Sequence, residues 1–229
     1  MPANAQSTKI EVPMDLADEV SWMAFFGGAR DQKQCGSCWA FAAGGLIEGI
    51  SSQSKNSGKP WADYVSTQQL IDCNTKAHGC NGGDPGSSVK WSVTNNGNMW
   101  DAKYPYEEKQ STCRQTTADN QVLVTSAEWV GLNVTADEFK ALVAKGPNHA
   151  RFQVTDAFFQ YKTGVWKDAC TDQANHAMVA VGYGTDANGL YWIIRNSWAA
   201  TWGEAGYGRI SDSVAPFGCG MRRYIWKFA

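Results

Sequence analysis

The stretch that decides the fold reads QKQCGSCWAF and covers residues 32–41. It passes from the turn-forming residues Gly36 and Ser37 into an apolar run that starts at Cys38 and has helical spacing. A thiol in the first turn of a helix faces unpaired backbone N–H groups and the positive end of the helix dipole. Because both favour the thiolate, we predict that Cys38 is a nucleophile at a helix N-terminus.

A nucleophilic thiolate needs donors for an oxyanion, an imidazole that exchanges its proton, and a group that holds the imidazole. The backbone N–H of Cys38 can supply one donor, and the side-chain amide of Gln32 is the candidate for a second. His176 opens an expected strand at 177–183, and Asn196 directly follows another. We therefore expect the two side chains to project from adjacent strands beside the thiol.

Trp198 is expected to act with His176, and the other two histidines, His149 and His78, are given no catalytic role. Trp198 is expected to cover the hydrogen bond between His176 and Asn196 and to shield it from water. His149, on an expected strand, is interpreted as a structural histidine with its hydrogen bonds satisfied. His78, in a glycine-flanked loop, is interpreted as solvated.

Composition limits the classes of partner. The chain has 229 residues, 43% of them hydrophobic and 18% charged, which is typical of a globular protein with a sizeable core. A net charge of −2 gives no basic footprint, so no nucleic-acid partner is expected. No apolar run approaches the ~20 residues that cross a bilayer, so no membrane partner is expected either. Residues 1–12 lack a signal-peptide core, which favours a processed chain with an added Met1.

The chain has seven cysteines, an odd number that favours three disulfides and one free thiol. Disulfides indicate a lysosomal, vacuolar or secreted protein, whereas seven reduced thiols would fit the cytosol. Cys35 and Cys38 alone would also fit a redox pair, which requires a βαβ context. Cys73, His78 and Cys80 have the residue types of a zinc site, but their spacing does not match structural zinc patterns. No metal ligands are therefore expected.

The two halves of the chain differ in pattern. The first is helical: an apolar helix follows Cys38, a capping box at Ser66–Gln69 starts a second helix, and a third is expected over 86–93. The second half opens with a helix capped by Thr135 and Glu138 and then turns to strands, expected at 149–154, 177–183, 191–195 and 207–211.

This pattern predicts an α+β fold with an active-site cleft between its two parts. We expect an N-terminal extension over 1–19, a helical subdomain over 20–124 that carries the nucleophile, and a strand-rich subdomain over 125–229 that carries the histidine and the asparagine.

Five motifs together resemble the papain family of cysteine proteases, in the order that the family has them. They are CGSCWAF at 35–41, GCNGG at 79–83, NHAM at 175–178, VGYG at 181–184 and NSW at 196–198. The likeness covers roughly residues 20–224. It implies a papain-like two-domain fold, with a helical left domain and a β-barrel-like right domain.

The resemblance also implies an activity. Cys38 would attack a peptide carbonyl and form an acyl-enzyme, His176 would pair with it and protonate the leaving amine, and Asn196 would orient the imidazole. Gln32 and the Cys38 N–H would form the oxyanion hole. The implied activity is that of a cysteine endopeptidase without metal or cofactor. The alternative is a papain-fold protein that binds peptides or acts as a scaffold without catalysis.

Substrate-binding residues and disulfides follow from the same likeness. Gly82 and Gly83 would hydrogen-bond an extended substrate backbone. The pocket for the side chain two residues before the cut would lie near Asp84, Pro85, Arg151, Asn175 and Tyr224, with Trp198 also at the site. The implied disulfides are Cys35–Cys80, Cys73–Cys113 and Cys170–Cys219. We expect this pocket to prefer a medium-sized apolar residue and to tolerate an acidic one.

The expected partners are peptide and protein substrates, a propeptide and cystatin-like inhibitors, and the chain is expected to be a monomer. Asn133 begins the glycosylation sequon Asn-Val-Thr. With no adjacent spare histidine pair to hold a C-terminal carboxylate, endopeptidase rather than exopeptidase activity is expected. The sequence departs from the family at Lys33, which replaces a usual glycine, and at Ala199-Ala200 after the NSW motif.

Overall fold

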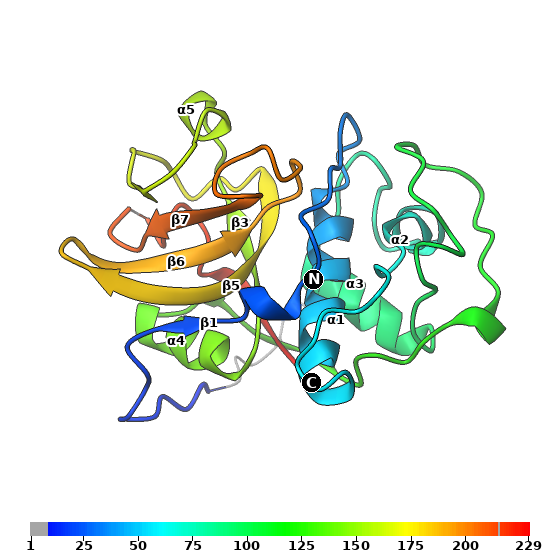
Figure 1. Ribbon diagram of the computed structural model, residues 1–229, viewed down its shortest axis with the longest axis horizontal. Coiled ribbons are helices and arrows are strands. Elements are labelled where there is room, and N and C mark those ends of the chain that lie inside the picture. Colours follow the sequence, from blue (N-terminus) through cyan, green and yellow to red (C-terminus); the bar gives the residue numbers. More distant parts are fainter. Residues whose placement is uncertain (1–8, 215) are drawn as a thin grey trace.

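The computed structural model describes residues 9–214 and 216–229, so residues 1–8 of the expected N-terminal extension lie outside the described residues. Helices fill the first half of the chain, as predicted, and strands dominate the second (Figure 1). In the described residues, the first half contains three α-helices and two 3₁₀ helices: α1 (Cys38–Lys55), α2 (Thr67–Cys73), α3 (Pro85–Thr94), η1 (Met23–Phe25) and η2 (Thr117–Asp119).

Helix α1 lies at the boundary between the two halves and is buried along most of its length (Figure 1). It packs against α2 and α3 on one side and against strand β5 (His176–Asp186) on the other. A Cβ atom added at Gly45 would lie 3.3 Å from the Val179 side chain of β5, closer than most real contacts. Glycine, otherwise unfavourable in a helix, therefore lets α1 approach the sheet closely.

The predicted helix caps are present, one of them only in part. The Thr135 hydroxyl accepts the backbone N–H of Glu138, whose carboxylate accepts the N–H of Thr135, so this capping box is complete. At α2, Ser66 accepts the N–H of Gln69, but the Gln69 side chain binds Gln115 and Asn120 instead of returning to the cap. The expected capping box there is half formed because tertiary partners use the amide.

The strand half contains two sheets. In the larger one the order is β1-β5-β6-β7-β4, with β3 pairing to β5, and only β4 and β7 run parallel. The smaller one pairs β2 with β8. The remaining elements of this half are β1 (Val20–Ser21), β2 (Ala127–Asn133), α4 (Ala136–Lys145), β3 (Asn148–Phe152), α5 (Asp156–Phe159), β4 (Val165–Trp166), β6 (Gly189–Arg195), β7 (Tyr207–Ser211) and β8 (Arg223–Phe228).

The described strands thus form an α+β fold without a single closed barrel, and the expected barrel-like half consists of two adjoining sheets. One apolar cluster fills the strand half around Phe152, Phe158 and Trp192. A second joins α1 to one face of β5 through Leu46 and Val179. Strand β1 belongs to the larger sheet by its pairing with β5. The predicted boundary between the two subdomains near residue 125 stays a prediction. β1 precedes this boundary in the sequence but pairs with β5, which follows it.

Three disulfides tie the loops, and their pairs are those that the resemblance implied: Cys35–Cys80, Cys73–Cys113 and Cys170–Cys219. The first holds the loop that contains Gly82 against the turn before α1. Cys38 is the free cysteine of the described chain.

Candidate active site

Cys38 is the first residue of α1 and is partly exposed. The preceding residue, Ser37, caps no backbone N–H with its side chain, so the first-turn donors remain open to another group. Burial raises the pKa of the Cys38 thiol, while the backbone N–H groups of Ala177 and Trp39 and the charge of Arg151 act to lower it. The N–H of Ala177 that faces the thiol belongs to the residue after His176. The structure therefore brings Cys38 and the start of β5 together.

His176 is held by Asn196 and covered by Trp198. Its Nε2 lies 2.8 Å from Asn196 Oδ1, a bond that leaves Nδ1 as the ring nitrogen available to a neighbour. The Trp198 ring stacks on the imidazole with centroids 4.7 Å apart and planes inclined by 28°. His176 and Asn196 are both buried. The indole therefore excludes water from one face of the imidazole, which strengthens the hydrogen bond.

The pKa of His176 follows from its burial. Burial lowers it to about 4, and the hydrogen bond that the ring donates to Asn196 Oδ1 opposes that shift. Together with the raised pKa of Cys38, this means that neither group ionises readily alone at neutral pH. An ion pair between them would therefore have to form by transfer of the thiol proton to the ring, with each charge stabilising the other.

Gln32 is buried and fixed on three sides. Its Oε1 accepts the Ser197 hydroxyl at 2.6 Å, its Nε2 donates to the Cys35 carbonyl at 3.1 Å, and its backbone N–H donates to the Ser197 carbonyl at 2.9 Å. One amide hydrogen on Nε2 remains, next to the turn that leads into Cys38. Tyr106 adds a fourth restraint, since its hydroxyl donates to the Gln32 carbonyl at 2.6 Å.

Ser197 and Tyr106 are residues that the sequence interpretation missed. Ser197 lies inside the NSW motif, but its role depends on a contact with a residue 165 positions away. Tyr106 lies in none of the sequence motifs, so no signal in the sequence pointed to it.

Gly82 and Gly83, the glycine strip that is expected to bind the substrate backbone, lie directly beside the start of α1. A Cβ atom at Gly83 would overlap the Trp39 ring at 2.6 Å, so only glycine fits there. Gly82 has a φ of +116°, and no atom lies within 4 Å of where its Cβ would stand. The strip is therefore packed on one side against the residue after Cys38 and open at Gly82.

Arg151 links several of the remaining predicted substrate-binding residues. Its Nη2 lies 2.6 Å from Asp84 Oδ2, and its guanidinium lies over the Tyr224 ring at 4.4 Å. The other Asp84 oxygen accepts the Ser87 N–H at 2.7 Å as the N-cap of α3. Burial acts to raise the pKa of Asp84, but its electrostatic interactions with His149, in the protonated form that the ring takes at acidic pH, and with Arg151 outweigh it and lower the pKa. The register Arg151–Ala177 in β3 and β5 places this cluster beside the thiol.

The other two of these residues are engaged elsewhere. Pro85 is buried in the first turn of α3. The Asn175 side chain binds the backbone of Val154, accepting its N–H at 2.8 Å and donating to its carbonyl at 3.2 Å. Asn175 thus fixes the loop before His176.

The expectation for His149 was wrong in one respect. The ring is fully buried, as a structural histidine is, but neither nitrogen has a hydrogen-bond partner among the described residues. Burial lowers its pKa to about 4, so the ring is neutral at neutral pH. The charge of Asp84 and the backbone of Tyr224 oppose this lowering of the pKa but do not outweigh the burial.

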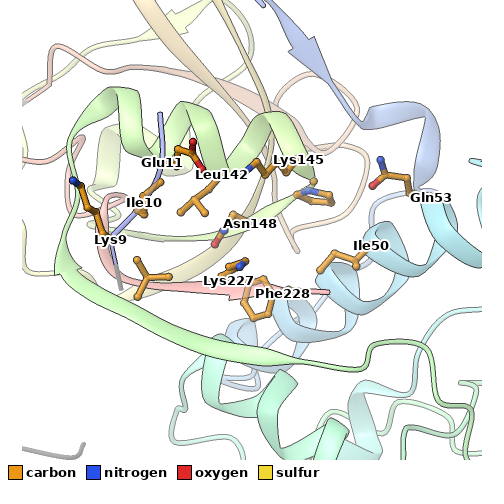
Figure 2. A pocket seen from close by; sticks show the side chains of 13 residues that line it. Lys9, Ile10, Glu11, Ile50, Gln53, Leu142, Lys145, Asn148, Lys227 and Phe228 are labelled. Atoms are coloured by element: carbon orange, nitrogen blue, oxygen red, sulfur yellow. The ribbon is translucent and has the colours of Figure 1, made fainter. Parts of the chain in front are cut away.

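A cavity of about 240 Å³ lies away from all these residues (Figure 2). It opens between the second half of α1, the end of α4 and β8, and the close-up shows Ile50, Leu142, Lys145, Lys227 and Phe228 around it. None of the predicted catalytic residues lines it. The described residues contain no group of three or more His, Cys, Asp or Glu side chains placed to hold a metal ion. Across 9–214 and 216–229 no helix combines the length and apolar character needed to span a membrane.

Comparison with known proteins agrees with this geometry. The model of the family "Papain family cysteine protease" matches residues 15–226. The chain belongs to the papain family of cysteine proteases. Its relatives include Cysteine proteinase 3 of Entamoeba histolytica, 39% identical over 83% of this chain, and Zingipain-2 of Zingiber officinale, 35% identical over 92% of this chain and 95% of the relative. This papain-family chain spans 61% of the Entamoeba proteinase and 54% of mouse Pro-cathepsin H.

Solved structures of papain-family members share the fold. The bromelain protease of Ananas comosus in complex with the E64 inhibitor matches with a TM-score of 0.82 and 33% identity, over 93% of this chain and 99% of bromelain. Digestive procathepsin L 3 of Tenebrio molitor matches with a TM-score of 0.84 and 29% identity, over 97% of this chain and 73% of that one.

Proposed function

We propose that this chain is a cysteine endopeptidase that hydrolyses peptide bonds through a thiolate–imidazolium pair and an acyl-enzyme. The observation that carries the proposal is the set formed by Cys38 at the start of α1, the neighbouring His176 held by Asn196, and the Trp198 ring that covers the imidazole. A nucleophile, a base and a group that orients the base are the components that acyl transfer requires.

The hydrogen bonds support the following division of roles. Asn196 occupies Nε2 of His176, so Nδ1 takes the thiol proton from Cys38. The thiolate attacks the scissile carbonyl, and the oxyanion is met by the Cys38 N–H and the remaining Nε2 hydrogen of Gln32. His176 then gives its proton to the leaving amine, which departs and leaves a thioester on Cys38. Water attacks the thioester with His176 as base, releasing the acid and regenerating the thiol.

The alternative is a non-catalytic papain-fold binding protein. Titration with an irreversible, thiol-directed epoxide followed by peptide mapping separates the two. We expect one equivalent of label on Cys38, and loss of labelling in His176→Ala. If the folded, reduced protein is not labelled, the endopeptidase proposal is wrong. Peptides blocked at both termini should be cleaved, whereas cleavage of free-ended peptides alone would indicate an exopeptidase.

The cluster around Arg151 supports a proposal for the side chain two residues before the cut. Both Asp84 oxygens are occupied, by Arg151 and by the Ser87 N–H, whereas a guanidinium has five N–H donors. The cation of Arg151 already pairs with the Asp84 carboxylate, so the cluster offers donors and the face of Tyr224 rather than an unpaired anion. We expect medium-sized apolar residues to be preferred there, acidic ones to be tolerated and basic ones to be disfavoured.

Peptides that differ only at this position test the proposal. In Arg151→Met the ratio of glutamate to leucine cleavage should fall by about fivefold, the effect of a partly exposed charge pair. A cleavage profile in which the wild-type enzyme prefers arginine two residues before the cut would contradict this proposal.

Three disulfides also favour an oxidising or lytic compartment, lysosomal, vacuolar or secreted. Relatives solved as precursors, such as digestive procathepsin L 3, support a propeptide as a partner of this chain. We further propose that the enzyme is a monomer, that cystatin-like inhibitors bind its cleft and that Asn133, at the exposed end of β2, is a glycosylation site.

A further inference from the structure

The cavity of about 240 Å³ in Figure 2 lies at the boundary between the two halves of the molecule. Its walls come from the second half of α1, the end of α4, the strand β8 and the segment 9–11 before β1. In Figure 2 Leu142 and Lys145 of α4 lie along one side, and Lys227 and Phe228 of β8 lie along the other. A ligand in this cavity would therefore contact the helical half through α1 and the strand half through α4 and β8.

Close packing forms the end of the cavity at α1. A Cβ atom added at Gly49 would lie 2.8 Å from Pro147 Cγ, so glycine lets α1 approach the chain that follows α4. Gln53, one turn further along α1, lies near the same chain, with its Oε1 3.9 Å from where a Cβ of Gly146 would stand. This end of the cavity is therefore defined by the packing of a buried helix.

The interior of the cavity is apolar. Its apolar lining residues are Ile10, Ile50, Val130, Leu142, Pro147 and Phe228. The buried amide of Asn148, which also lines it, already has partners on both atoms. Its Nδ2 donates to the Trp226 carbonyl at 3.0 Å, and its Oδ1 accepts the His149 N–H at 2.9 Å. The interior therefore offers apolar contact to the body of a ligand.

The rim of the cavity carries an excess of positive charge. Lys9, Lys145 and Lys227 are exposed there, and Glu11 is the one carboxylate among the described lining residues. Within the described part of the chain none of the three lysines has an ion-pair partner. Glu128 lies opposite Lys227 in the register of β2 and β8 but does not line the cavity. An anion at the rim would therefore meet more cations than carboxylates.

The volume limits the size of a ligand. An apolar cavity of about 150 Å³ holds one benzene ring. The cavity of about 240 Å³ therefore has room for one ring and a short chain. It is smaller than the pockets of about 300–1,000 Å³ that hold drug-sized ligands.

We propose that this cavity binds a small arylalkyl acid, with the ring against Leu142 and Phe228 and the carboxylate at Lys145. The ring is stabilised by removal of apolar surface from water and by contact with the Phe228 ring. Lys145 is the partner of the acid, because Glu11 accompanies Lys9 in the same segment and Glu128 faces Lys227. The site does not use Cys38, so it does not rest on the proposed function.

Calorimetric titration with three ligands that share one body tests the proposal. They are 4-phenylbutyrate, the neutral 4-phenylbutanol and the cationic 4-phenylbutylamine. At pH 7 we expect one equivalent of 4-phenylbutyrate to bind with a Kd of about 0.1–1 mM, a range that suits a ligand of this size. The alcohol should bind about twofold to fivefold more weakly, the effect of one exposed ion pair, and the amine more weakly still. Alkylation of Cys38 with iodoacetamide should leave these affinities unchanged.

Two variants separate the charge from the cavity. Lys145→Gln should weaken binding of the acid by about twofold to fivefold and leave binding of the alcohol unchanged. Lys140→Gln is the matched control, because Lys140 lies on the same helix but over the Tyr183 ring, and it does not line the cavity. Ile50→Phe, which fills the cavity, should weaken the acid and the alcohol alike by about tenfold or more. Circular dichroism of each variant checks that the fold is retained.

Each failure has its own meaning. Absence of 4-phenylbutyrate binding, or wild-type affinity in Ile50→Phe, would overturn the site. Equal affinities for the acid and the amine, or equal losses in Lys145→Gln and Lys140→Gln, would overturn the assignment of an acid to Lys145. Loss of binding on alkylation of Cys38 would place the ligand in the catalytic cleft and overturn the proposal. Failure of the endopeptidase proposal is reported separately, by the epoxide titration.

Discussion

Single residues around the site are held by partners far away in the sequence. Gln32 is positioned by Ser197, 165 residues later, and Arg151 by Asp84, 67 residues earlier. Local motifs were enough to propose which residues carry the chemistry, because a thiol at the start of an apolar helix is visible in the sequence. They could not predict the roles of Ser197 and Tyr106, because those contacts exist only once distant segments are packed together.

Ser197→Ala should lower kcat/KM for peptides by about tenfold, since the amide of Gln32 loses the hydroxyl that fixes its orientation. Ser197→Thr, which keeps the hydroxyl, should retain more activity. The loss should appear in kcat more than in KM, because the oxyanion forms only in the transition state. An equal loss in both variants would show that packing, rather than the hydroxyl, is required.

His149 gives a prediction for the pH dependence of stability. Its pKa, about 4 in the fold, lies below the ordinary value of about 6.5, so between these pH values the unfolded chain binds more protons. The free energy of unfolding should therefore fall as the pH drops from 6.5 to 4. His149→Phe should flatten this slope in urea titrations between pH 4.5 and 7. An unchanged slope would show that His149 is charged in the fold or that other groups dominate.

At the scale of elements, short-range patterns predicted the helices well. The capping box at Thr135 and Glu138 is complete, and α3 starts at Pro85, one residue before the expected start. Of the eight described strands, β3, β5, β6 and β7 were predicted in place, and the adjacency of β5 and β6 was expected. β1, β2, β4 and β8 were not predicted, and the pairing of β2 with β8 and the parallel pairing of β4 with β7 left no mark in the sequence. Pairing depends on contacts of high sequence separation, which alternation alone does not specify.

Thr135→Ala should destabilise the protein by about 1 kcal/mol, because the N–H of Glu138 loses its acceptor at the start of α4. Thr135→Ser keeps the hydroxyl and should cost less than half as much. Urea unfolding of the three proteins at one pH measures the difference. Equal stability of Thr135→Ala and the wild type would mean that solvent replaces the cap.

On the scale of the whole molecule, the two halves meet at a buried polar contact. Arg195, at the end of β6, donates to the Gly28 carbonyl at 2.8 Å and lies over the Phe26 ring at 5.2 Å. Burial raises the pKa of Glu48 on α1, and the charge of Arg195 opposes that shift. This contact joins the helix that carries Cys38 to the strand that leads into Asn196.

Arg195→Met should destabilise the protein by about 3 kcal/mol or more, because it removes the cation beside the buried Glu48. Adding Glu48→Gln should recover part of the loss, since the remaining buried charge is then removed. The comparison needs unfolding curves of both single variants and the double variant. Strictly additive losses would show that the two charges do not interact across the boundary.

The pH dependence of Cys38 alkylation by iodoacetamide tests the central claim most directly. If His176 takes the thiol proton, the wild type should be alkylated rapidly well below neutral pH, and His176→Ala should lose this low-pH reactivity. Alkylation that rises only near the ordinary thiol pKa of about 8.5, alike in both proteins, would contradict the thiolate–imidazolium pair.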